Sequence, residues 1–307
     1  MKAAFFEAHG GPEVLQVGEF PDPVCGPDDL LVDIHAASVN GADWKVRAGR
    51  SGTLEKFPHI LGRDFSGTVA EVGANVSGFA PGDAVFAVLP GGQEGTYAEK
   101  VAVPASVVAP KPDSLTHMEA AAVALVSLTA IISVEDTLGL KPGEKILIQG
   151  GAGGVASIAI RLAKHIGAHV VTTCSTGNID YVSGFGPDEI VDYTTTDFVE
   201  AVSGCDAVFE TVGGEVATRS FDVLKPGGRI AFIASGPKAP PAPRADIQSL
   251  RPQVGRSRAE MERIARRIAE GAIRVPEIAR LTLDDVVEAH RISEGRHLRG
   301  KLVFEIR

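Results

Sequence analysis

The sequence predicts an α/β fold that combines a β-rich domain with a domain built on a doubly wound parallel sheet. Its 307 residues are enough for about two domains of roughly 100–200 residues each. Short strand-like segments separated by Gly and Pro turns fill the first third, and strand and helix patterns alternate after Thr116. A Gly-rich turn joins the first strand of the alternating part to a helix, which is the arrangement of nucleotide-binding folds.

Four segments of the first part have the length and the apolar pattern of strands. They are residues 30–35, 67–72, 83–89 and 97–103, and a single helical pattern lies at 42–48. Gly-Gly and Pro-Gly-Asp turns separate these segments. We therefore expect a compact, partly closed β-rich domain.

The second part begins with a capping-box pattern, Thr116-His-Met-Glu119, ahead of a long Ala-rich helix pattern that Gly139 and the Lys141-Pro-Gly turn end. Strand and helix patterns then alternate, as in a parallel sheet covered by helices. The strands are expected at 145–149, 169–174, 190–193, 207–212 and 230–234, and the helices at 155–165, 178–183, 198–202 and 215–224.

The last part starts with a Pro-rich polar stretch at 236–245, which is typical of a linker. A second capping box, Ser257-Arg-Ala-Glu260, predicts a helix up to about Gly271. A helix at 284–294 and a strand at 301–306 follow.

Charge and cysteine content exclude several classes of protein. With a formal net charge of −9 the chain has no overall basic field, so neither nucleic acid nor a membrane surface is an expected partner. Cys25, Cys174 and Cys205 form no CxxC pair, which argues against a disulfide framework or a Cys-rich zinc site. The apolar stretch 120–134 is too short to span a membrane, and no secretory signal pattern opens the chain, so we expect a cytoplasmic protein.

The segment KILIQGGAGGVA is the most informative motif. Read as Gly151-x-Gly153-x-x-Ala156, it matches the dinucleotide-binding fingerprint. In this interpretation Gly151 allows the tight turn, Gly153 lets a pyrophosphate approach the backbone, and Ala156 keeps the helix close to the strand. The N–H groups of Gly154 and Val155 at the helix start then bind the phosphates. A Gly-rich turn without a ligand is the alternative, which the surrounding strand and helix patterns disfavour.

The chain resembles the medium-chain dehydrogenase/reductase superfamily, in its zinc-free quinone oxidoreductase (zeta-crystallin-like) branch. The resemblance extends over nearly the whole sequence. It is carried, in this order, by GGPEVL (10–15), SVNGADWKVRAG (38–49), FPHILGRDFSGTVAEVG (57–73), FAPGDAVF (79–86), GGAGGVA (150–156) and RGKLVFEI (299–306).

This resemblance implies a GroES-like substrate domain that is interrupted by a Rossmann domain. With the pattern changes above, it predicts a GroES-like domain at 1–117 and 246–307 and a Rossmann domain at 118–245. It also implies a cleft between the domains, which the loops 49–57 and 89–96 would line, and by analogy a homodimer. Zinc-dependent relatives carry Gly-His-Glu where this chain has Gly62-Arg63-Asp64 and a Cys earlier in the domain, so no zinc is expected.

Three residues are candidates for the catalytic cleft, each with a structural alternative. Asn40 resembles the family Asn beside the nicotinamide ribose, and it can equally cap a helix. Trp44 can line the cleft or lie in the core, and Asp64 can face the cleft or form an ion pair with its neighbour. Asp43 and Arg47, four residues apart, are expected to pair along the helix.

Further residues are candidates for binding the cofactor. By resemblance, Thr129 lies near the phosphates and Lys301 approaches the cofactor, although an exposed Lys at a strand start is an equal alternative for the latter. Ligands lie at the carboxyl ends of parallel strands, so the segments that follow two predicted strands are candidates for the ribose and the nicotinamide. These candidates are Thr211, Val212, Ala234 and Gly236.

The region after the fingerprint favours NADPH over NADH. An NAD-specific site places Asp or Glu about 20 residues after the Gly motif. No acid precedes Asp180 here, so a carboxylate that would repel the 2′-phosphate is expected to be absent. No Lys or Arg lies between His165 and Tyr193 either, so Ser175, Asn178 and Tyr193 are the neutral groups expected to hold the phosphate.

Together these features predict a metal-free, NADPH-dependent reductase. Its small-molecule acceptor would be a quinone or an α,β-unsaturated ketone or aldehyde, in which donors stabilise the oxygen that gains charge. An NADPH-binding redox sensor or structural protein with little turnover is an alternative. A zinc alcohol dehydrogenase is a further alternative that the missing ligands disfavour.

Overall fold

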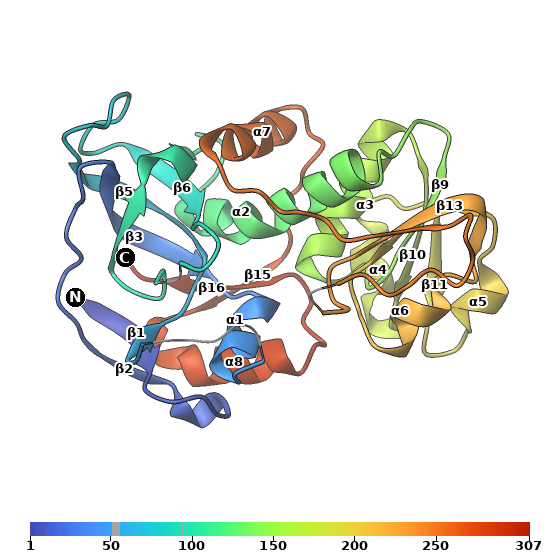
Figure 1. Ribbon diagram of the computed structural model, residues 1–307, viewed down its shortest axis with the longest axis horizontal. Helices are drawn as coiled ribbons and strands as arrows, with labels where there is room; N and C mark the ends of the chain where they lie inside the picture. Colours follow the sequence, from blue (N-terminus) through green and yellow to red (C-terminus); the bar gives the residue numbers. More distant parts are fainter. Residues whose placement is uncertain (51–55, 94, 237) are drawn as a thin grey trace. The chain divides into compact units, whose positions relative to one another are not determined.

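The computed structural model describes residues 1–50, 56–93, 95–236 and 238–307, and it confirms the predicted fold class (Figure 1). Contacts within the chain define two compact units. The first unit comprises Met1–Leu125, Gly255–Arg266 and Val275–Arg307, and the second comprises Val126–Val254 and Arg267–Arg274. The first boundary between the units falls at 125/126 and not at the predicted 117/118, because helix α2 (His117–Ile131) continues across it. The second falls at 254/255 and not at 245/246, because an additional strand, Gln248–Leu250, belongs to the second unit.

The first unit is built on a seven-stranded sheet. Along its main path the strands are β15 (Ile278–Leu281), β16 (Lys301–Glu305), β3 (Asp29–Ser38), β5 (Asp64–Val72), β6 (Ala84–Val88) and β8 (Val108–Pro110), and β7 (Lys100–Pro104) pairs with β3. A three-stranded sheet of β2 (Gln16–Glu19), β1 (Lys2–Phe6) and β4 (His59–Ile60) was not predicted. The strands predicted around 30–35, 67–72 and 83–89 are confirmed, and the one predicted at 97–103 begins only at Lys100.

Strand β3 lies at the centre of the first unit because it pairs with β5, β7 and β16. Alternate residues of this strand, Leu30, Val32 and Ile34, are buried in one hydrophobic core with Phe65 and Phe304. Two short helices of this unit, α1 (Gly41–Arg47) and α8 (Val286–Glu294), contact each other.

The second unit is a doubly wound domain with a six-stranded parallel sheet. Its strand order is β11 (Glu189–Asp192), β10 (His169–Cys174), β9 (Lys145–Ile148), β12 (Cys205–Glu210), β13 (Leu224–Phe232) and β14 (Gln248–Leu250). Its helices include α3 (Gly154–Ile166), α4 (Ile179–Ser183), α5 (Phe198–Ala201) and α6 (Glu215–Arg219). The order of strands reverses between β9 and β12, which is where such folds bind their ligands.

Two expectations about the end of this unit are wrong. The stretch 236–245 is not a linker between domains: its described residues connect the neighbouring strands β13 and β14, and Ala239 and Ala242 pack on the sheet's core. The helix expected at 215–224 ends at Arg219, because the chain joins the sheet again at Leu224.

The apolar helix predicted after Thr116 is confirmed as α2 (His117–Ile131), continued by a π-helical turn at Ile132–Thr137. Its capping box forms, since Thr116 N donates to Glu119 Oε2 at 2.8 Å and Glu119 N donates to Thr116 Oγ1 at 3.2 Å. With 21 residues and a mean hydropathy of 1.7, the helix could cross a membrane by length and composition alone. However, 83% of its most apolar window is buried within the protein, as in the core helix of a globular protein.

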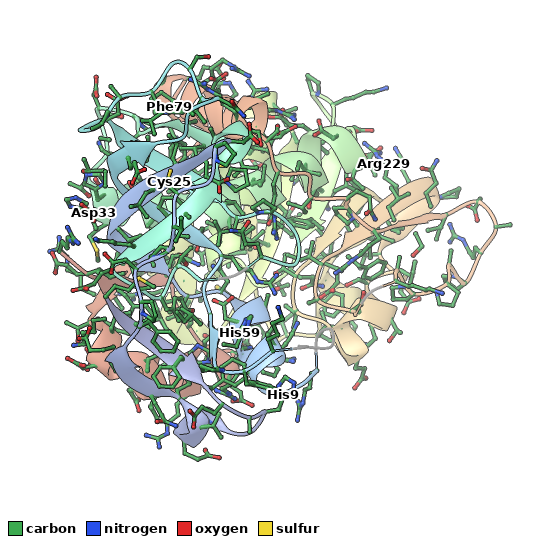
Figure 2. All side chains as sticks on the ribbon, turned by 60° about the vertical axis from the view of Figure 1, so that its left-hand side comes forward. His9, Cys25, Asp33, His59, Phe79 and Arg229 are labelled. Atoms are coloured by element: carbon green, nitrogen blue, oxygen red, sulfur yellow. The ribbon has the colours of Figure 1, made fainter. Side chains whose placement is uncertain are left out.

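Arg229 of β13, whose side chain is labelled in Figure 2, binds groups of several turns in the second unit. Its guanidinium donates to both carboxylate oxygens of Glu144 and to the carbonyls of Leu138 and Gly139. Burial is the largest single influence on Glu144 and opposes its ionisation, but the hydrogen bonds from Arg229 and the Lys141 backbone and the charge of Arg229 together hold the pKa of this carboxyl below its usual value. The ion pair thus fixes the approach to β9, the strand that leads into the Gly-rich turn.

The pairing of β3 with β5 predicts that Gly67→Ala destabilises the first unit. A Cβ at Gly67 would lie 2.1 Å from the carbonyl oxygen of Asp33, so the strand backbone would have to move, at a cost of about 1–3 kcal/mol. Gly255→Ala is the control, because no atom lies within 4 Å of its added Cβ. The fluorescence of Trp44, the sole Trp, reports unfolding of this unit in urea; equal midpoints for the two variants would contradict the prediction.

Candidate functional site

The Gly-rich turn leaves β9 at the point where the strand order of the second unit reverses. Gly150 has a φ of 72°, so this residue makes the left-handed turn that the sequence analysis assigned to Gly151. Gly151 is required for a different reason: a Cβ there would lie 2.4 Å from Thr172 Oγ1 of the neighbouring strand β10. The turn therefore needs both glycines, one for its backbone angle and one for packing.

Gly153 is the residue before α3, and its surroundings are open. A Cβ at this position would meet only the carbonyl oxygen of Gly150, at an ordinary distance of 3.4 Å. No side chain caps the helix, and its first turn contains no acidic residue. The N–H groups at Gly154 and Val155 and the positive end of the helix dipole thus suit an anionic group such as a pyrophosphate.

A buried polar network supports this turn from within the sheet. Gly150 N donates to Thr173 Oγ1 at 3.0 Å, and Thr173 Oγ1 donates to Gln149 Oε1 at 2.7 Å. The Gln149 amide in turn donates to Ser220 Oγ at 3.1 Å, and Thr211 Oγ1 donates to the Gln149 carbonyl at 2.8 Å. Gln149 was not among the predicted site residues, although a polar residue at the end of an apolar strand was a signal for it.

Glu210, at the end of β12, is a second residue that the sequence analysis missed. Its Oε1 accepts hydrogen bonds of 2.6 Å from the N–H groups of both Val212 and Gly213. The side chain is completely buried, and burial raises the pKa of this carboxyl. Gly213 has a φ of 85°, and a Cβ there would lie 2.9 Å from the carbonyl oxygen of Ala234. Glu210 therefore holds the turn that follows β12 in one conformation.

The structure brings together the candidates at the ends of β12 and β13. A Cβ at Gly150 would lie 3.2 Å from Thr211 Oγ1 and 3.1 Å from Val212 Cγ2, so the β9 and β12 turns are adjacent. Ala234 and Gly236 follow β13, and the Ser235 hydroxyl between them has no partner among the described residues. Thr129 lies on α2 and is partly buried.

The loop after β10 contains two of the three residues expected to hold a 2′-phosphate, and Asn178 Nδ2 donates there to Ser175 Oγ at 3.0 Å. The third, Tyr193, follows β11; its N–H donates to the Cys174 carbonyl at 3.1 Å, and its side chain is exposed. The expectation that no carboxylate lies near this loop is wrong. Thr176 Oγ1 donates to Asp192 Oδ2 at 2.5 Å, because parallel pairing places Asp192 opposite Cys174, the last residue of β10.

A buried polar cluster in the first unit contains three more candidates. Asn40 Nδ2 donates to Asp64 Oδ1 at 2.9 Å, and Lys301 Nζ donates to Asn40 Oδ1 at 2.8 Å and to the Val39 carbonyl at 2.7 Å. Asp64 also accepts from Ser38 Oγ at 2.9 Å. Lys301 is therefore buried, and the alternative of an exposed Lys at a strand start is wrong.

Burial is the main influence on the charges of this cluster. It raises the pKa of Asp64 and lowers the pKa of Lys301, and the attraction between these two groups opposes both shifts. Asn40 lies between them and hydrogen-bonds to each. Its backbone N–H donates to Asp43 Oδ2 at 2.8 Å, as in a helix cap, so Asn40 has the capping position as well as the polar contacts.

The ion pairs expected along this segment are different from those observed. Arg47 does not pair with Asp43; it is completely buried and binds Glu294 of α8 at 2.7 Å. Asp43 instead accepts from the Tyr97 hydroxyl at 2.7 Å and lies 3.5 Å from Arg63 Nε. Arg63 thus lies against Asp43, and Asp64 binds Ser38 and Asn40, in place of the expected pair of Arg63 with Asp64.

Trp44 lies in the core, since only 4% of it is exposed. Among the three catalytic candidates, Asn40 and Asp64 are in contact. The charged groups of Lys45, Arg50 and Arg296 lie within 5.8 Å of the centroid of the Trp44 ring.

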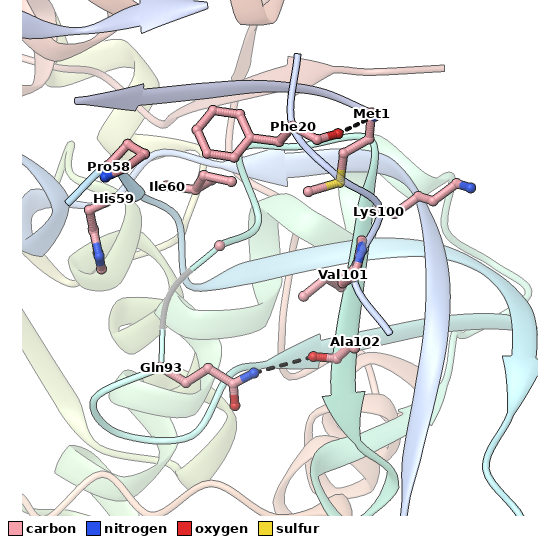
Figure 3. Close-up of a pocket in the computed structure, with 11 residues that line it drawn as sticks. Met1, Phe20, Pro58, His59, Ile60, Gln93, Lys100, Val101 and Ala102 are labelled. Atoms are coloured by element: carbon pink, nitrogen blue, oxygen red, sulfur yellow. Dashed lines mark hydrogen bonds between the residues drawn. The ribbon is translucent and has the colours of Figure 1, made fainter. Parts of the chain in front are cut away.

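The described residues contain no group of three or more His, Cys, Asp or Glu side chains that could hold a metal. Within the loops 49–57 and 89–96, residues 51–55 and 94 lie outside the described part of the chain. A cavity of about 360 Å³ in the first unit is lined by Phe20, His59, Gln93, Val101 and other residues (Figure 3). None of the predicted site residues lines it, so it is separate from the polar cluster.

Two family profiles match the chain. The profile described as an alcohol dehydrogenase GroES-like domain matches residues 26–113, and the one described as a zinc-binding dehydrogenase matches residues 185–304. Among relatives, the mitochondrial NAD(P)H oxidoreductase RTN4IP1 of Mus musculus is 37% identical over 228 residues, which are 67% of this chain and 58% of the relative. The 2-methylene-furan-3-one reductase of Solanum lycopersicum is 36% identical over 260 residues, 81% of this chain and 66% of the relative.

Solved structures match the whole chain. The quinone oxidoreductase from Coxiella burnetii is 32% identical with a TM-score of 0.91, and the match covers 100% of this chain and 99% of that one. The Escherichia coli quinone oxidoreductase complexed with NADPH is 26% identical with a TM-score of 0.91, covering 99% of this chain and 100% of the other. In contrast, the chain spans only 58–65% of the length of the RTN4IP1 proteins that it matches.

The open side of Gly153 predicts that Gly153→Val folds but loses affinity for NADPH. The added Cβ has space in the protein, and the branched side chain would occupy the approach of a phosphate. Losing about two charge-assisted hydrogen bonds costs about 3 kcal/mol, or roughly a hundredfold in Kd. Fluorescence titration with NADPH measures this, with Gly255→Val as the control. A folded Gly153→Val protein with unchanged affinity would contradict the assignment of the phosphate site.

The contacts of Glu210 predict different results for two substitutions. Glu210→Gln keeps an oxygen for the N–H groups of Val212 and Gly213, so the Kd for NADPH should change little. Glu210→Ala leaves both N–H groups without an acceptor, which costs about 1–3 kcal/mol and should weaken binding by about tenfold. Equal affinities for the two variants would show that Glu210 does not position this turn.

Proposed function

Because the chain belongs to the medium-chain dehydrogenase/reductase superfamily as a quinone oxidoreductase-like member, we propose that it is an NADPH-dependent reductase of quinones or α,β-unsaturated carbonyl compounds. The observation that carries this proposal is the Gly150–Val155 turn, with its open side and uncapped helix, at the switch point of the parallel sheet. The relatives support it, since one is named for reduction of a conjugated ketone and a similar quinone oxidoreductase was solved with NADPH.

Bound NADPH would supply a hydride, and the chain's own groups would hold it in place. The N–H groups of Gly154 and Val155 bind the pyrophosphate. The turn held by Glu210 and the unpartnered hydroxyl of Ser235 provide donors and acceptors at the ends of β12 and β13, for the ribose and the nicotinamide amide.

In the first unit, the Asn40–Asp64–Lys301 cluster supplies polar groups for the reaction. Lys301 Nζ uses two of its three possible donor directions, on Val39 and Asn40, so one hydrogen remains for an oxygen that gains negative charge. Asp64 accepts from the Asn40 amide and thereby keeps the Asn40 carbonyl toward Lys301. The proton that completes the reduction comes from solvent in this proposal.

We propose that this reaction uses no zinc. Two of the positions that hold zinc ligands in relatives carry Arg63 and Asp64 here. Arg63 lies 3.5 Å from Asp43, and Asp64 is surrounded by donors from Ser38, Asn40 and the backbone of Leu125. A guanidinium is no metal ligand, and a carboxylate so surrounded has few lone pairs left for one.

The assembly and the compartment are also proposals. A homodimer would extend the six-stranded sheet at β14, which is an edge strand. The named relatives include mitochondrial proteins, so they give no support to a cytoplasmic location, which stays a prediction from sequence.

Steady-state oxidation of NADPH, followed at 340 nm with a panel of quinones and enones, tests the function. We expect turnover with at least one acceptor class, and the same rate after treatment with a chelator. Tight NADPH binding without turnover would favour the redox-sensor alternative. Activity lost in chelator and restored only by zinc would favour an alcohol dehydrogenase.

Lys301→Met should lower kcat by about tenfold or more with little change in NADPH affinity, because it removes a donor to the developing charge.

A further inference from the structure

Asp192 lies where two neighbouring strands of the second unit end. It is the last residue of β11 and pairs in parallel register with Cys174, the last residue of β10. Its carboxylate is directed at the loop that follows β10, since Thr176 Oγ1 donates to Oδ2 at 2.5 Å. Thr194 holds it from the other side through its N–H at 2.9 Å and its hydroxyl at 2.6 Å, both to Oδ1.

This position is significant because of what binds at the end of the second strand in a dinucleotide-binding fold. The ribose of the adenosine half lies there, and an acidic residue on that strand accepts its hydroxyls when the cofactor is NADH. Here β10 ends in Cys174, followed by Ser175 and Thr176, and carries no such acid. Asp192 therefore brings a carboxylate to this loop from the neighbouring strand.

The Asp192 carboxylate is ionised, and no cation neutralises it within the described part of the chain. Hydrogen bonds from Thr176 and Thr194 hold the pKa of this carboxyl below its usual value, so it is ionised at neutral pH. Asp192 forms no ion pair in the described part of the chain. The basic residues of the neighbouring elements contact other acids: Lys164 of α3 binds Asp188, and His169 at the start of β10 lies against Glu189.

The carboxylate also retains capacity for a ligand. An ionised carboxylate offers about four acceptor sites, and the two threonines occupy three of them. One site thus remains for a ribose hydroxyl. A 2′-phosphate held by the neutral groups of Ser175 and Asn178 would instead lie close to a negative charge.

We infer that Asp192 reduces the preference of this chain for NADPH over NADH, because its carboxylate accepts a ribose hydroxyl of NADH and repels the 2′-phosphate of NADPH. The inference rests on the proposed dinucleotide site. The neutral donors of the β10 loop allow NADPH to bind. Asp192 keeps the affinity for NADPH from greatly exceeding the affinity for NADH, so the protein accepts both cofactors.

The substitution Asp192→Asn tests this inference, because it keeps the shape of the side chain and removes its charge. We expect the ratio of the Kd for NADH to the Kd for NADPH to rise by about tenfold, with NADPH bound more tightly and NADH more weakly. The rise should be smaller at high salt, which screens exposed charges. Glu200→Gln, an exposed acid on α5, is the matched control for net charge and should leave the ratio unchanged.

Competition by 5′-AMP and by 2′,5′-ADP provides a second measurement that involves only the adenosine half. Asp192→Asn should strengthen binding of 2′,5′-ADP and not of 5′-AMP. Unchanged ratios in both assays, with NADPH and NADH still bound, would overturn the role of Asp192 and leave the proposed function intact. Failure of the unsubstituted protein to bind either cofactor would overturn the proposed function and this inference together.

Discussion

The parallel hydrogen bonding of β9 to β10 on one side and to β12 on the other is the constraint on which the second unit depends. It places the carboxyl ends of three strands side by side, so that Thr211 lies against Gly150 and Thr172 against Gly151. The close approach of Thr172 requires a glycine at position 151, and the turn from strand to helix requires one at position 150. The open helix start at Gly153 follows from this packing.

Polar residues buried beneath the turn make that geometry rigid. Gln149 connects the β9 end to Thr173 of β10 and to Ser220, and Glu210 fixes the turn after β12 through two short hydrogen bonds. Such groups are costly to bury unless they are satisfied, which ties their side chains to one arrangement. A dinucleotide would therefore meet groups that are already in position, and little ordering would be needed on binding.

Local patterns were sufficient to predict most of this fold. The apolar periodicity of β3, β5, β9, β10 and α3 and the capping boxes at Thr116 and Ser257 all depend on residues close in sequence. The strands that were missed, such as β4 and β14, are two or three residues long and owe their conformation to the neighbours with which they pair. The same holds for the site: the Gly motif is local, whereas the roles of Glu210 and Asp192 depend on which strands lie side by side.

The first unit shows why burial must be known before a charged residue can be interpreted. Lys301 and Arg47 belong to segments whose sequence is compatible with exposed side chains, yet both are buried and bound to partners more than 240 residues away along the chain. Burying charges such as those of Asp64 and Lys301 costs desolvation energy that their attraction scarcely repays, so stability alone is a weak reason for the cluster. Its arrangement fits the proposed chemistry, in which Asn40 is held between Asp64 and Lys301, and Lys301 would donate its remaining hydrogen to an oxygen that becomes anionic during reduction.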